Sequence, residues 1–375
     1  MNQPLRIVQM IDSIKVGGAE KLLVNFAAEA QAHDLPLAVI GLKQIPASPV
    51  EAELRSLQAQ VVYFTGQGLL SPGRILRIAR FLRQGQFDIL HTHLTYANII
   101  GVLAGRLAGL PVIGTLHSVS QEARHYHAGR QRLEAWGLRL GARRVIAVGH
   151  SVAQAHQPRL GNKPITVIPN AVPAPAALSA AERLALRQSI TGNAAGNAER
   201  PLMIAVGRLS IPKGYADLLD ALAVVRSACP GVALVIAGDG PLRTDLQAQA
   251  EALGLGSSVI LLGARTDVPA LLAASDLFVS ASHWEGLPLA LLEAMMAGLP
   301  CVVTSVGENP LVLSPGTGRL VPPHQPDQLA AAVIDLLHDP EQRARLGQAA
   351  RQHAEAHYHT RPWFERLLSL YQECL

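Results

Sequence analysis

Two glutamates stand eight positions apart around a glycine turn, in the segment SASHWEGLPLALLEAMMAGLP at residues 280–300. The preceding residues 276–282 have the composition of a buried strand, and the residues after Pro288 have that of a helix. We expect Glu285 at the end of the strand and Glu293 about two turns into the helix. Free amides and the positive end of the dipole favour oxygen-rich or anionic groups at a helix start. The spacing therefore predicts two carboxylates that hold one polar ligand.

The same pair also has an ordinary structural explanation. Acidic residues are favoured in the first turn of a helix, and two glutamates at this spacing occur by chance in many proteins. The prediction of a ligand site therefore depends on further matching residues along the chain.

Two cations lie around the turn that ends the predicted strand at residues 201–208. Arg208 and Lys213 lie in the segment AVGRLSIPKGY. A guanidinium and an ammonium, together with helix amides, can stabilise the charge that develops on a diphosphate leaving group without a metal ion. An ordinary surface loop is the alternative interpretation.

Glycines and histidines mark the ends of predicted strands in the first half of the chain. Gly17 and Gly18 would let the backbone approach a phosphate or sugar, although a simple turn is the more frequent cause. His91 and His93 share one strand face, but no third ligand follows from the spacing, so we expect hydrogen-bonded structural residues rather than a metal site. His117 ends the next predicted strand.

Composition excludes several classes of protein. At 375 residues the chain exceeds a typical domain of roughly 100–200 residues, so two domains are expected. An aromatic content of 4% argues against stacking platforms for single-stranded nucleic acid. Three widely separated cysteines fit neither a disulfide framework nor a zinc site and favour a reducing cytoplasm. We find neither a signal peptide nor an apolar run of about 20 residues, and expect a soluble or peripheral protein.

Positive charge is concentrated in the first half. Residues 1–180 contain 18 Lys and Arg against 9 Asp and Glu, a balance of +9, and the remaining 14 against 19 give −5. Many of the arginines fall in two predicted helices, Gly73–Gln84 and Glu122–Arg144. Basic amphipathic helices can rest on an anionic membrane, and a solvated helix face is an equally good explanation. The arginines of the first helix are Arg74, Arg77, Arg80 and Arg83.

Apolar runs alternate with helical stretches along both halves of the chain. This alternation predicts an α/β fold with parallel sheets covered by helices on both faces. Residues 167–183 and 189–201 are rich in Pro, Ala, Gly and Asn, as expected of a linker. The predicted strands are residues 5–11, 36–42, 60–64, 87–93, 111–118 and 144–151 before the linker, and 201–208, 232–240, 258–264, 276–282 and 300–305 after it.

Residues 5–360 together resemble the family-4 retaining glycosyltransferases of the GT-B fold. The resemblance is carried by the Glu-x7-Glu element at 285–293, the Gly-Gly-Ala-Glu loop at 17–20, the Leu-His pair at 116–117 and the GRL-x3-KG segment at 207–214. It implies two Rossmann-like domains across a cleft, residues 1–172 for the acceptor and 173–360 for the nucleotide sugar. The final helix, residues 361–375, is expected to pack back on the first domain.

The resemblance also assigns roles to individual residues. Glu285 and His117 would act at the transferred sugar, with the histidine donating to a hydroxyl or shaping the transition state, and Arg208 and Lys213 would bind the diphosphate. Glu293 would accept hydrogen bonds from the ribose hydroxyls. No metal ion is expected, because the Asp-x-Asp element of the GT-A class is absent. The residues expected at the donor are Gly17, Gly18, Arg208, Lys213, Asp239, Leu262, Gly263, Arg265, Glu285, Gly286, Leu287 and Glu293.

Several positions depart from the family pattern or fit another role. Ala171 stands where a glycine is usual, and Glu308 and Leu311 stand where a second glycine and a glutamate are common. The contacts of that second loop are therefore open. Asp239 fits a simple turn as well as a donor contact.

We therefore predict a retaining, metal-independent glycosyltransferase that uses a UDP- or GDP-linked sugar in polysaccharide, lipopolysaccharide or glycolipid synthesis and needs no cofactor. Without a carboxylate placed as nucleophile, retention favours front-face attack. The expected partners are the donor, a sugar or lipid-linked acceptor and an anionic membrane at its cytoplasmic face, but no nucleic acid. Two alternatives remain: a nucleotide-sugar epimerase or hydrolase of this fold, and a catalytically silent binding protein.

Overall fold

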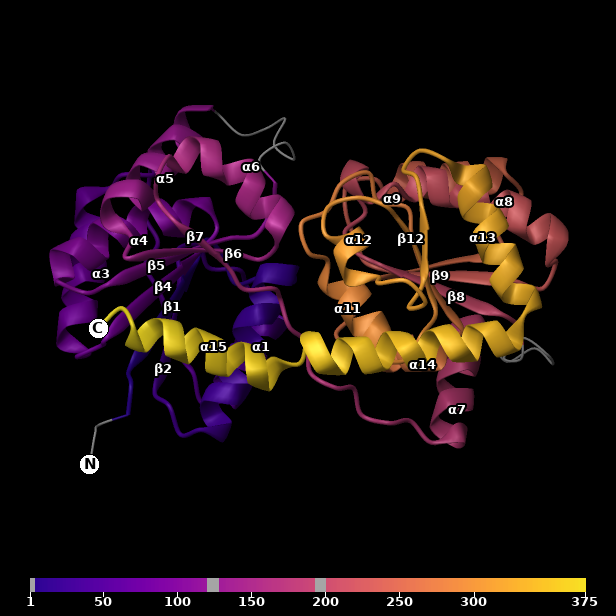
Figure 1. The fold of residues 1–375 in the computed structure, drawn as a ribbon, viewed down its shortest axis with the longest axis horizontal. Coiled ribbons are helices and arrows are strands. Elements are labelled where there is room, and N and C mark those ends of the chain that lie inside the picture. Colours follow the sequence, from indigo (N-terminus) through magenta and orange to yellow (C-terminus); the bar gives the residue numbers. More distant parts are fainter. Residues whose placement is uncertain (1–3, 120–127, 193–199) are drawn as a thin grey trace. The chain divides into compact units, whose positions relative to one another are not determined.

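The computed structural model describes residues 4–119, 128–192 and 200–375, which form two compact units. Unit 1 contains the chain up to Ala171 together with Thr360–Leu375, and unit 2 is the continuous stretch Val172–His359. Each unit is a parallel β-sheet between layers of helices (Figure 1). The chain therefore builds most of unit 1, then all of unit 2, and returns to unit 1 for its last helix.

The sheet of unit 1 has the strand order β3-β2-β1-β4-β5-β6-β7, and all its strands are parallel. In such a doubly wound sheet, ligands bind at the carboxyl ends of the strands where the order reverses, here at β1 and β4. The strands are β1 (Ile7–Ile11), β2 (Leu37–Gly41), β3 (Gln60–Tyr63), β4 (Ile89–His93), β5 (Val112–Leu116), β6 (Arg144–Ala147) and β7 (Ile165–Val167). The helices are α1 (Gly18–Ala32), α2 (Pro49–Ser56), α3 (Pro72–Gln84), α4 (Thr95–Ala108), α5 (Ala128–Gly141), α6 (His150–Leu160) and α15 (Thr360–Gln372).

The continuous apolar runs of the sequence follow from burial on both faces of this sheet. Every residue of β1, β2, β4 and β5 is buried. One face packs against α1, α2 and α15, with Phe26, Leu54 and Phe364 among its fully buried side chains. The other face is covered by α3, α4 and α5, which pack side by side.

The last helix, α15, completes the core of unit 1. The ring of Phe364 lies 4.9 Å from that of Phe26 on α1, centroid to centroid, and Thr360 donates a hydrogen bond of 2.6 Å to Glu29 Oε1. Tyr371, seven positions after Phe364, falls on the same face of the helix and is fully buried. In Figure 1 this yellow helix lies beside α1.

Unit 2 repeats the same strand order, β10-β9-β8-β11-β12-β13, and is also parallel throughout. Its order therefore reverses between β8 and β11. The strands are β8 (Leu202–Val206), β9 (Ala233–Ala237), β10 (Val259–Gly263), β11 (Leu277–Ser280), β12 (Cys301–Thr304) and β13 (Arg319–Val321). The helices are α7 (Ala180–Thr191), the 3-10 helix η2 (Ile211–Lys213), α8 (Tyr215–Ala228), α9 (Arg243–Ala252), α10 (Val268–Ala274), α11 (Leu289–Met296), α12 (Asn309–Val312), α13 (Pro326–His338) and α14 (Pro340–His357).

The predicted α/β architecture, with two Rossmann-like sheets, is confirmed, and every predicted strand is present. The sequence analysis did not predict β7 and β13. Each has three residues, lies at the edge of its sheet and is partly or largely exposed, so neither produces a long apolar run.

Part of the predicted linker is a helix of unit 2. Ser179 caps α7 in a reciprocal capping box with Glu182, a signal that the alanine-rich composition obscured. Arg187 of the same helix lies 3.1 Å from Asp276 Oδ2, which anchors α7 to the start of β11. The connection from unit 1 to unit 2 is therefore the short segment between Ala171 and Ser179.

The two basic helices differ from their predictions. The second ends at Gly141 rather than Arg144, because Arg144 begins β6, and residues 122–127 of the predicted helix lie outside the described ranges. In the first, Arg74 is only 5% exposed and donates hydrogen bonds of 2.6 and 2.8 Å to the carbonyl oxygens of Gly68 and Leu69. Arg74 therefore stabilises the preceding loop and is not part of an exposed basic face.

Candidate active site

Lys213 and Glu285 meet at the carboxyl-terminal edge of the unit 2 sheet. They lie on the segments that follow β8 and β11, which are neighbouring parallel strands. The Lys213 ammonium Nζ lies 2.6 Å from Glu285 Oε1, which also accepts a 2.6 Å hydrogen bond from Ser282 Oγ. Burying a carboxylate is costly unless it is paired, and Glu285 is only 7% exposed. No hydrogen bond joins Glu285 Oε2 to the described residues, which leaves this oxygen for a ligand.

The loop that carries Lys213 is fitted closely to the end of β11. Gly214 has a φ of +59°, and a Cβ at this position would lie 2.0 Å from the carbonyl oxygen of Ala281. The amide of His283 donates a 2.8 Å hydrogen bond to the carbonyl of Pro212. A glycine after the lysine is thus required by both conformation and space.

A second loop, between β12 and α12, supports the turn at Glu285. Thr304 Oγ1 donates to the carbonyl oxygen of Ser282 at 2.6 Å, and the Glu308 amide donates to that of Gly286 at 3.0 Å. Asn309 in turn donates to the carbonyl of Thr304 at 2.9 Å. Since Glu308 makes this contact through its backbone, the contact does not require a particular side chain there.

The sequence analysis missed Ser282, Thr304 and Asn309. They are small polar residues near strand ends, and nothing in their spacing marks them. Tyr215, also missed, donates to the Gly207 carbonyl at 3.0 Å, and its burial, followed by the charge of Glu285, raises the pKa of its hydroxyl.

Glu293 lies closer to the helix start than predicted. It is the fifth residue of α11, little more than one turn in rather than two, because Pro288 is the N-cap and the turn residues Gly286 and Leu287 are not helical. Glu293 is partly buried, whereas Gly286 and Leu287 are buried. Its backbone carbonyl accepts from Ala297 at the helix end.

The remaining residues predicted in unit 2 lie at or just after the carboxyl ends of strands in the same sheet. Gly263 ends the edge strand β10 just after Leu262, and its carbonyl accepts a 2.8 Å hydrogen bond from the Gly238 amide. The next residue, Asp239, accepts a 2.8 Å hydrogen bond from the Gly240 amide. A contact with the next residue is typical of a turn.

Two arginines of the predicted site differ in their contacts. Arg265 forms an exposed pair with Asp267 through two hydrogen bonds of 2.7 and 2.6 Å, and these bonds hold the pKa of Asp267 below its usual value. Arg208, the second residue after β8, is exposed, and its guanidinium makes no ion pair with any described residue. Arg208 therefore remains available for an anion.

The glycine loop lies in unit 1, after β1. Gly17 is the N-cap of α1, and Gly18 is its first residue, so the helix already begins within the Gly-Gly-Ala-Glu segment. A Cβ on Gly17 would lie 2.4 Å from Glu20 Oε2, so any other residue here would require this buried carboxylate to move. Burial raises the pKa of Glu20.

Three histidines cluster at the carboxyl ends of β4 and β5 in the same unit. His93 Nδ1 lies 3.0 Å from His117 Nε2, and the rings of His91 and His93 are 4.3 Å apart, centroid to centroid. Burial lowers the pKa of His117 to about 4 and that of His91 to about 3, and it holds the pKa of His93 well below its usual value. All three rings are therefore neutral near pH 7.

Asp12, immediately after β1, was not predicted. Its carboxylate accepts hydrogen bonds from the amides of Tyr96 and Ala97 at 3.3 and 2.7 Å, at the start of α4. Burial raises its pKa to about 7, against the opposing effect of these two amides. A carboxyl group that titrates near neutrality at a strand end is a common property of functional sites.

One side-chain group in the described ranges has the ligands and spacing for a metal ion. Its members are Asp217, His283 and His324, whose ligand atoms all lie within 4.8 Å of one another. Asp217 Oδ2 lies 3.0 Å from His283 Nε2 and 3.4 Å from His324 Nδ1. A carboxylate that pairs with two imidazoles gives the same distances, so this group needs no ion.

Two family models match the chain, one in each half. The model described as Glycosyltransferase Family 4 matches residues 16–174, and the model described as Glycosyl transferases group 1 matches residues 188–353.

Characterised relatives and solved structures extend this similarity. The UDP-Gal:alpha-D-GlcNAc-diphosphoundecaprenol alpha-1,3-galactosyltransferase of Escherichia coli is 31% identical over 71% of this chain and 70% of its own length. The alpha-D-kanosaminyltransferase of Streptomyces kanamyceticus is 27% identical over 88% of each chain. The crystal structure of Anabaena HepE in complex with UDP-glucose has a TM-score of 0.87 and 24% identity, covering 98% of this chain and 99% of that one.

Proposed function

Because the chain belongs to the GT-B glycosyltransferases of family 4 (glycosyl transferases group 1), we propose that it transfers a hexose from a UDP-linked donor to a lipid-linked sugar, with retention of configuration and without a metal ion. Its relatives are nucleotide-sugar-dependent glycosyltransferases. The UDP donor and the lipid-linked acceptor are taken from the printed name of the Escherichia coli relative.

The contact between Lys213 and Glu285 is the observation that carries the proposal. As the bond to the leaving group breaks, negative charge develops on the diphosphate, and Lys213 with the unpaired guanidinium of Arg208 would stabilise it. The Oε2 atom of Glu285 would accept a hydrogen bond from a hydroxyl of the transferred sugar. Lys213, held by Glu285, and the exposed Arg208 would together provide the charge that a metal ion would otherwise supply, which supports metal independence.

Front-face attack accounts best for retention. Glu285 Oε1 is held by Lys213 and Ser282, so this carboxylate is better suited to orient the sugar than to attack it. The acceptor oxygen would then bond to the anomeric carbon on the face from which the diphosphate departs. The departing phosphate oxygen would take the acceptor proton.

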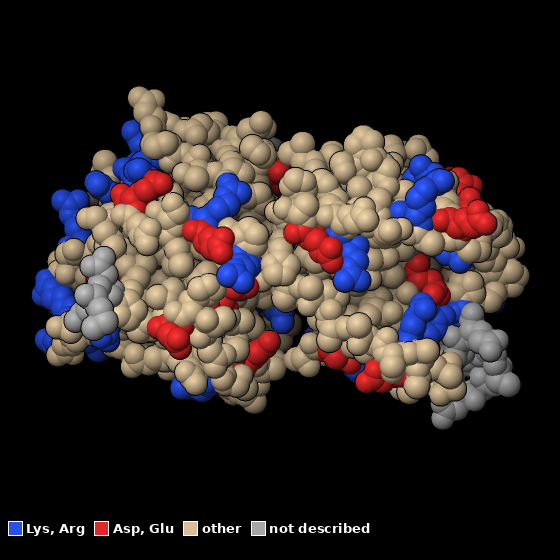
Figure 2. Space-filling view, turned by 60° about the horizontal axis from the view of Figure 1, so that its bottom comes forward, with Lys and Arg blue, Asp and Glu red and all other residues tan. Residues whose placement is uncertain are grey.

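An exposed amphipathic face of unit 1 supports a lipid-linked acceptor at a membrane. Leu76 and Leu107, 58% and 46% exposed, line a hollow of about 270 Å³ together with Arg80 and Arg83. Trp136, on the adjacent α5, is 58% exposed. Figure 2 shows basic side chains gathered at the left end of the molecule, where α3 lies in Figure 1. No helix in the described ranges is long and apolar enough to cross a membrane.

Labelled nucleotide sugars test the proposal directly. The full-length protein is incubated with UDP-galactose, UDP-glucose, UDP-N-acetylglucosamine or GDP-mannose, with and without a bacterial lipid extract and with and without EDTA. We expect transfer from a UDP sugar that requires the extract and ignores EDTA, and an α-anomer in the product by NMR. Conversion without acceptor would support an epimerase or hydrolase instead, and binding without turnover would support a silent binding protein.

A further inference from the structure

A line of buried polar groups joins the last helix of unit 1 to His117. Gln9, in the middle of β1, donates from Nε2 to the Tyr371 hydroxyl at 3.2 Å, and its Oε1 lies 2.5 Å from His93 Nε2. His93 Nδ1 lies 3.0 Å from His117 Nε2. Gln9 is 1% exposed, Tyr371 0% and His93 5%. The line therefore passes through the protein interior, where unmatched donors and acceptors are costly.

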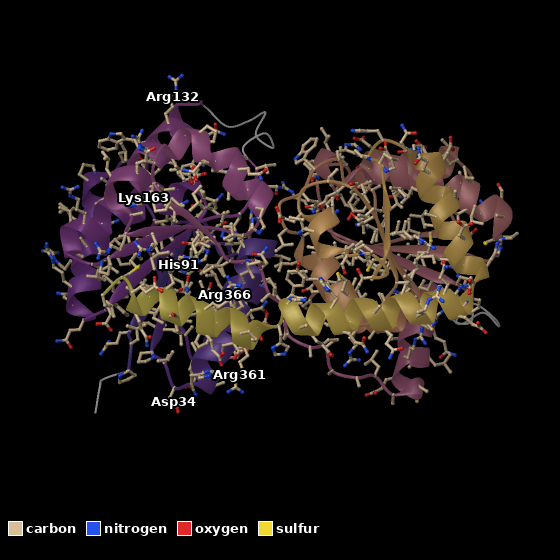
Figure 3. All side chains as sticks on the ribbon, viewed as in Figure 1. Asp34, His91, Arg132, Lys163, Arg361 and Arg366 are labelled. Carbon is tan, nitrogen blue, oxygen red and sulfur yellow. The ribbon has the colours of Figure 1, made fainter. Side chains whose placement is uncertain are left out.

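A branch of the same line fixes the Tyr371 hydroxyl. Its oxygen lies 2.6 Å from His91 Nδ1, and His91 Nε2 lies 2.6 Å from Thr115 Oγ1. Figure 3 shows His91 next to α15, the yellow helix that carries Tyr371. The tyrosine hydroxyl can thus donate to His91 while it accepts from Gln9.

The Gln9 amide determines the direction of every hydrogen bond up to His117. A carbonyl oxygen only accepts, so His93 Nε2 must carry a hydrogen. A neutral imidazole has one N–H, so His93 Nδ1 accepts, and His117 Nε2 must donate to it. His117 Nδ1 is then left with its lone pair and has no hydrogen bond to a described residue. Turning the amide over would reverse each of these roles.

We propose that Gln9 and Tyr371 are positioning residues that hold His117 in the tautomer protonated at Nε2, so that its bare Nδ1 faces the substrate as a hydrogen-bond acceptor. Only the last step, in which Nδ1 accepts from a hydroxyl of the transferred sugar, rests on the proposed function. The assignment differs from the donor role that the family resemblance implies. It also makes α15, the last element of the chain, a determinant of site chemistry.

NMR of the ligand-free protein tests the tautomer without reference to activity. The full-length protein is labelled with ¹⁵N-histidine, and the His117 ring signals are assigned as those absent from His117→Ala. We expect Nε2–H and unprotonated Nδ1 in the parent, and a mixture of tautomers in Tyr371→Phe and in Gln9→Met. Thr115→Val is the matched control: it removes a partner of His91 at the far end of the branch, and we expect it to leave His117 unchanged. A parent His117 protonated at Nδ1, or an unchanged tautomer in both variants, would overturn the proposal.

Kinetics separate a positioning role from simple loss of packing. Once a donor is known, Tyr371→Phe should lower turnover about tenfold with little change in KM, since the imidazole still samples the productive tautomer part of the time. The same substitution should have no further effect in a His117→Ala background. An equal loss in both backgrounds contradicts the role in positioning His117. If His117→Ala is fully active while Tyr371→Phe and Gln9→Met change the tautomer of His117 as expected, the tautomer assignment holds and the role of His117 at the sugar is refuted.

Discussion

Lys213 and Glu285 are 72 positions apart in the sequence and share a hydrogen bond of 2.6 Å. The carboxylate is buried, so the lysine serves the fold as well as the proposed chemistry, and its removal leaves the Ser282 hydroxyl as the remaining partner of Oε1. Arg208, at the same end of the sheet strands, is exposed and stabilises no buried carboxylate among the described residues. The two cations of the proposed diphosphate site therefore differ in what their loss would do to stability.

We expect Lys213→Ala to lower turnover by about 10²- to 10³-fold, because a fixed charge at the leaving group is lost. Steady-state rates with the preferred donor, in buffer with EDTA, provide the measurement. The control is Arg319→Ala. It removes a cation at the amino-terminal end of β13, away from the carboxyl ends of the strands where Lys213 lies, and should leave turnover unchanged. A requirement of the parent for added Mg²⁺ or Mn²⁺ would contradict the metal-independent site.

At the scale of elements, the β12–α12 loop and the turn at Glu285 fit together with almost no free space. Gly307 has a φ of +54°, and a Cβ at this position would lie 2.1 Å from the carbonyl oxygen of Glu285. Both sides of this contact are backbone, so neither can rotate away. The position of Glu285 therefore depends on a residue 22 positions later.

We expect Gly307→Ala to lower the free energy of unfolding by about 2–4 kcal/mol, because it adds a steric clash to a left-handed backbone conformation. Urea unfolding provides the measurement. The control is Gly316→Ala, where φ is +88° but nothing lies within 4 Å of the added Cβ. It should cost only about 1 kcal/mol, from the backbone conformation alone. Equal losses would show that the contact with Glu285 is easily relieved.

The arginines of α3 divide into one structural residue and three exposed ones. We expect the triple variant Arg77→Gln, Arg80→Gln, Arg83→Gln to bind anionic liposomes more weakly at low salt, since each basic residue contributes about 1 kcal/mol near such a surface. Sedimentation with vesicles measures this. Arg74→Gln should instead lower stability, because its side chain is buried against the preceding loop.

A charge-matched control distinguishes a membrane-binding face from net charge. The variant Arg319→Gln, Arg345→Gln, Arg351→Gln removes three exposed arginines from unit 2. If it weakens vesicle binding as much as the α3 variant does, or if the parent does not bind anionic vesicles at low ionic strength, the α3 face is a solvated surface.

The sequence predicted elements better than contacts. Apolar runs identify strands buried on both faces, and these predictions are confirmed, whereas the short edge strands carry no such signal. The line from Tyr371 to His117 could not be predicted, because Gln9 and Tyr371 are 362 positions apart and no spacing relates them. A weaker signal was present: a glutamine within the apolar run IVQMI must find a partner once the strand is buried. The sequence shows this need but not the partner that satisfies it.

At the scale of the whole molecule, a cluster of histidines makes the stability of unit 1 depend on pH. We expect unit 1 to lose stability as pH falls from 6.5 to 4.5, since unfolding releases three buried histidines whose folded pKa values lie below the unfolded value of about 6.5. The unfolded chain then binds protons that the folded chain does not, so stability falls with pH, by on the order of 1–3 kcal/mol per ring. Asp12 and Glu20 act in the opposite direction, because burial raises the folded pKa of each carboxyl above its unfolded value. Each carboxyl offsets at most about one ring, so the three histidines prevail.

Tryptophan fluorescence can follow unit 1 alone. Trp136 and Trp363 lie in unit 1, and Trp284 lies in unit 2. In a Trp284→Phe variant, urea unfolding at pH 6.5 and 4.5 should therefore give a lower midpoint in acid. An unchanged midpoint would mean that the three rings are hydrated or protonated in the folded protein.

The return of the chain to unit 1 has a consequence for the order in which the protein is made. Unit 2 is one continuous stretch, so it has all its residues as soon as His359 leaves the ribosome. Synthesis of unit 1 begins first, but unit 1 lacks Phe364, Leu367 and Tyr371 of its core until Thr360–Leu375 are synthesised. Domains generally fold during synthesis in the order in which they emerge. Here that order is inverted: the unit that is translated first is the last to close its core, and it exposes the apolar face of α1 until α15 has emerged from the ribosome.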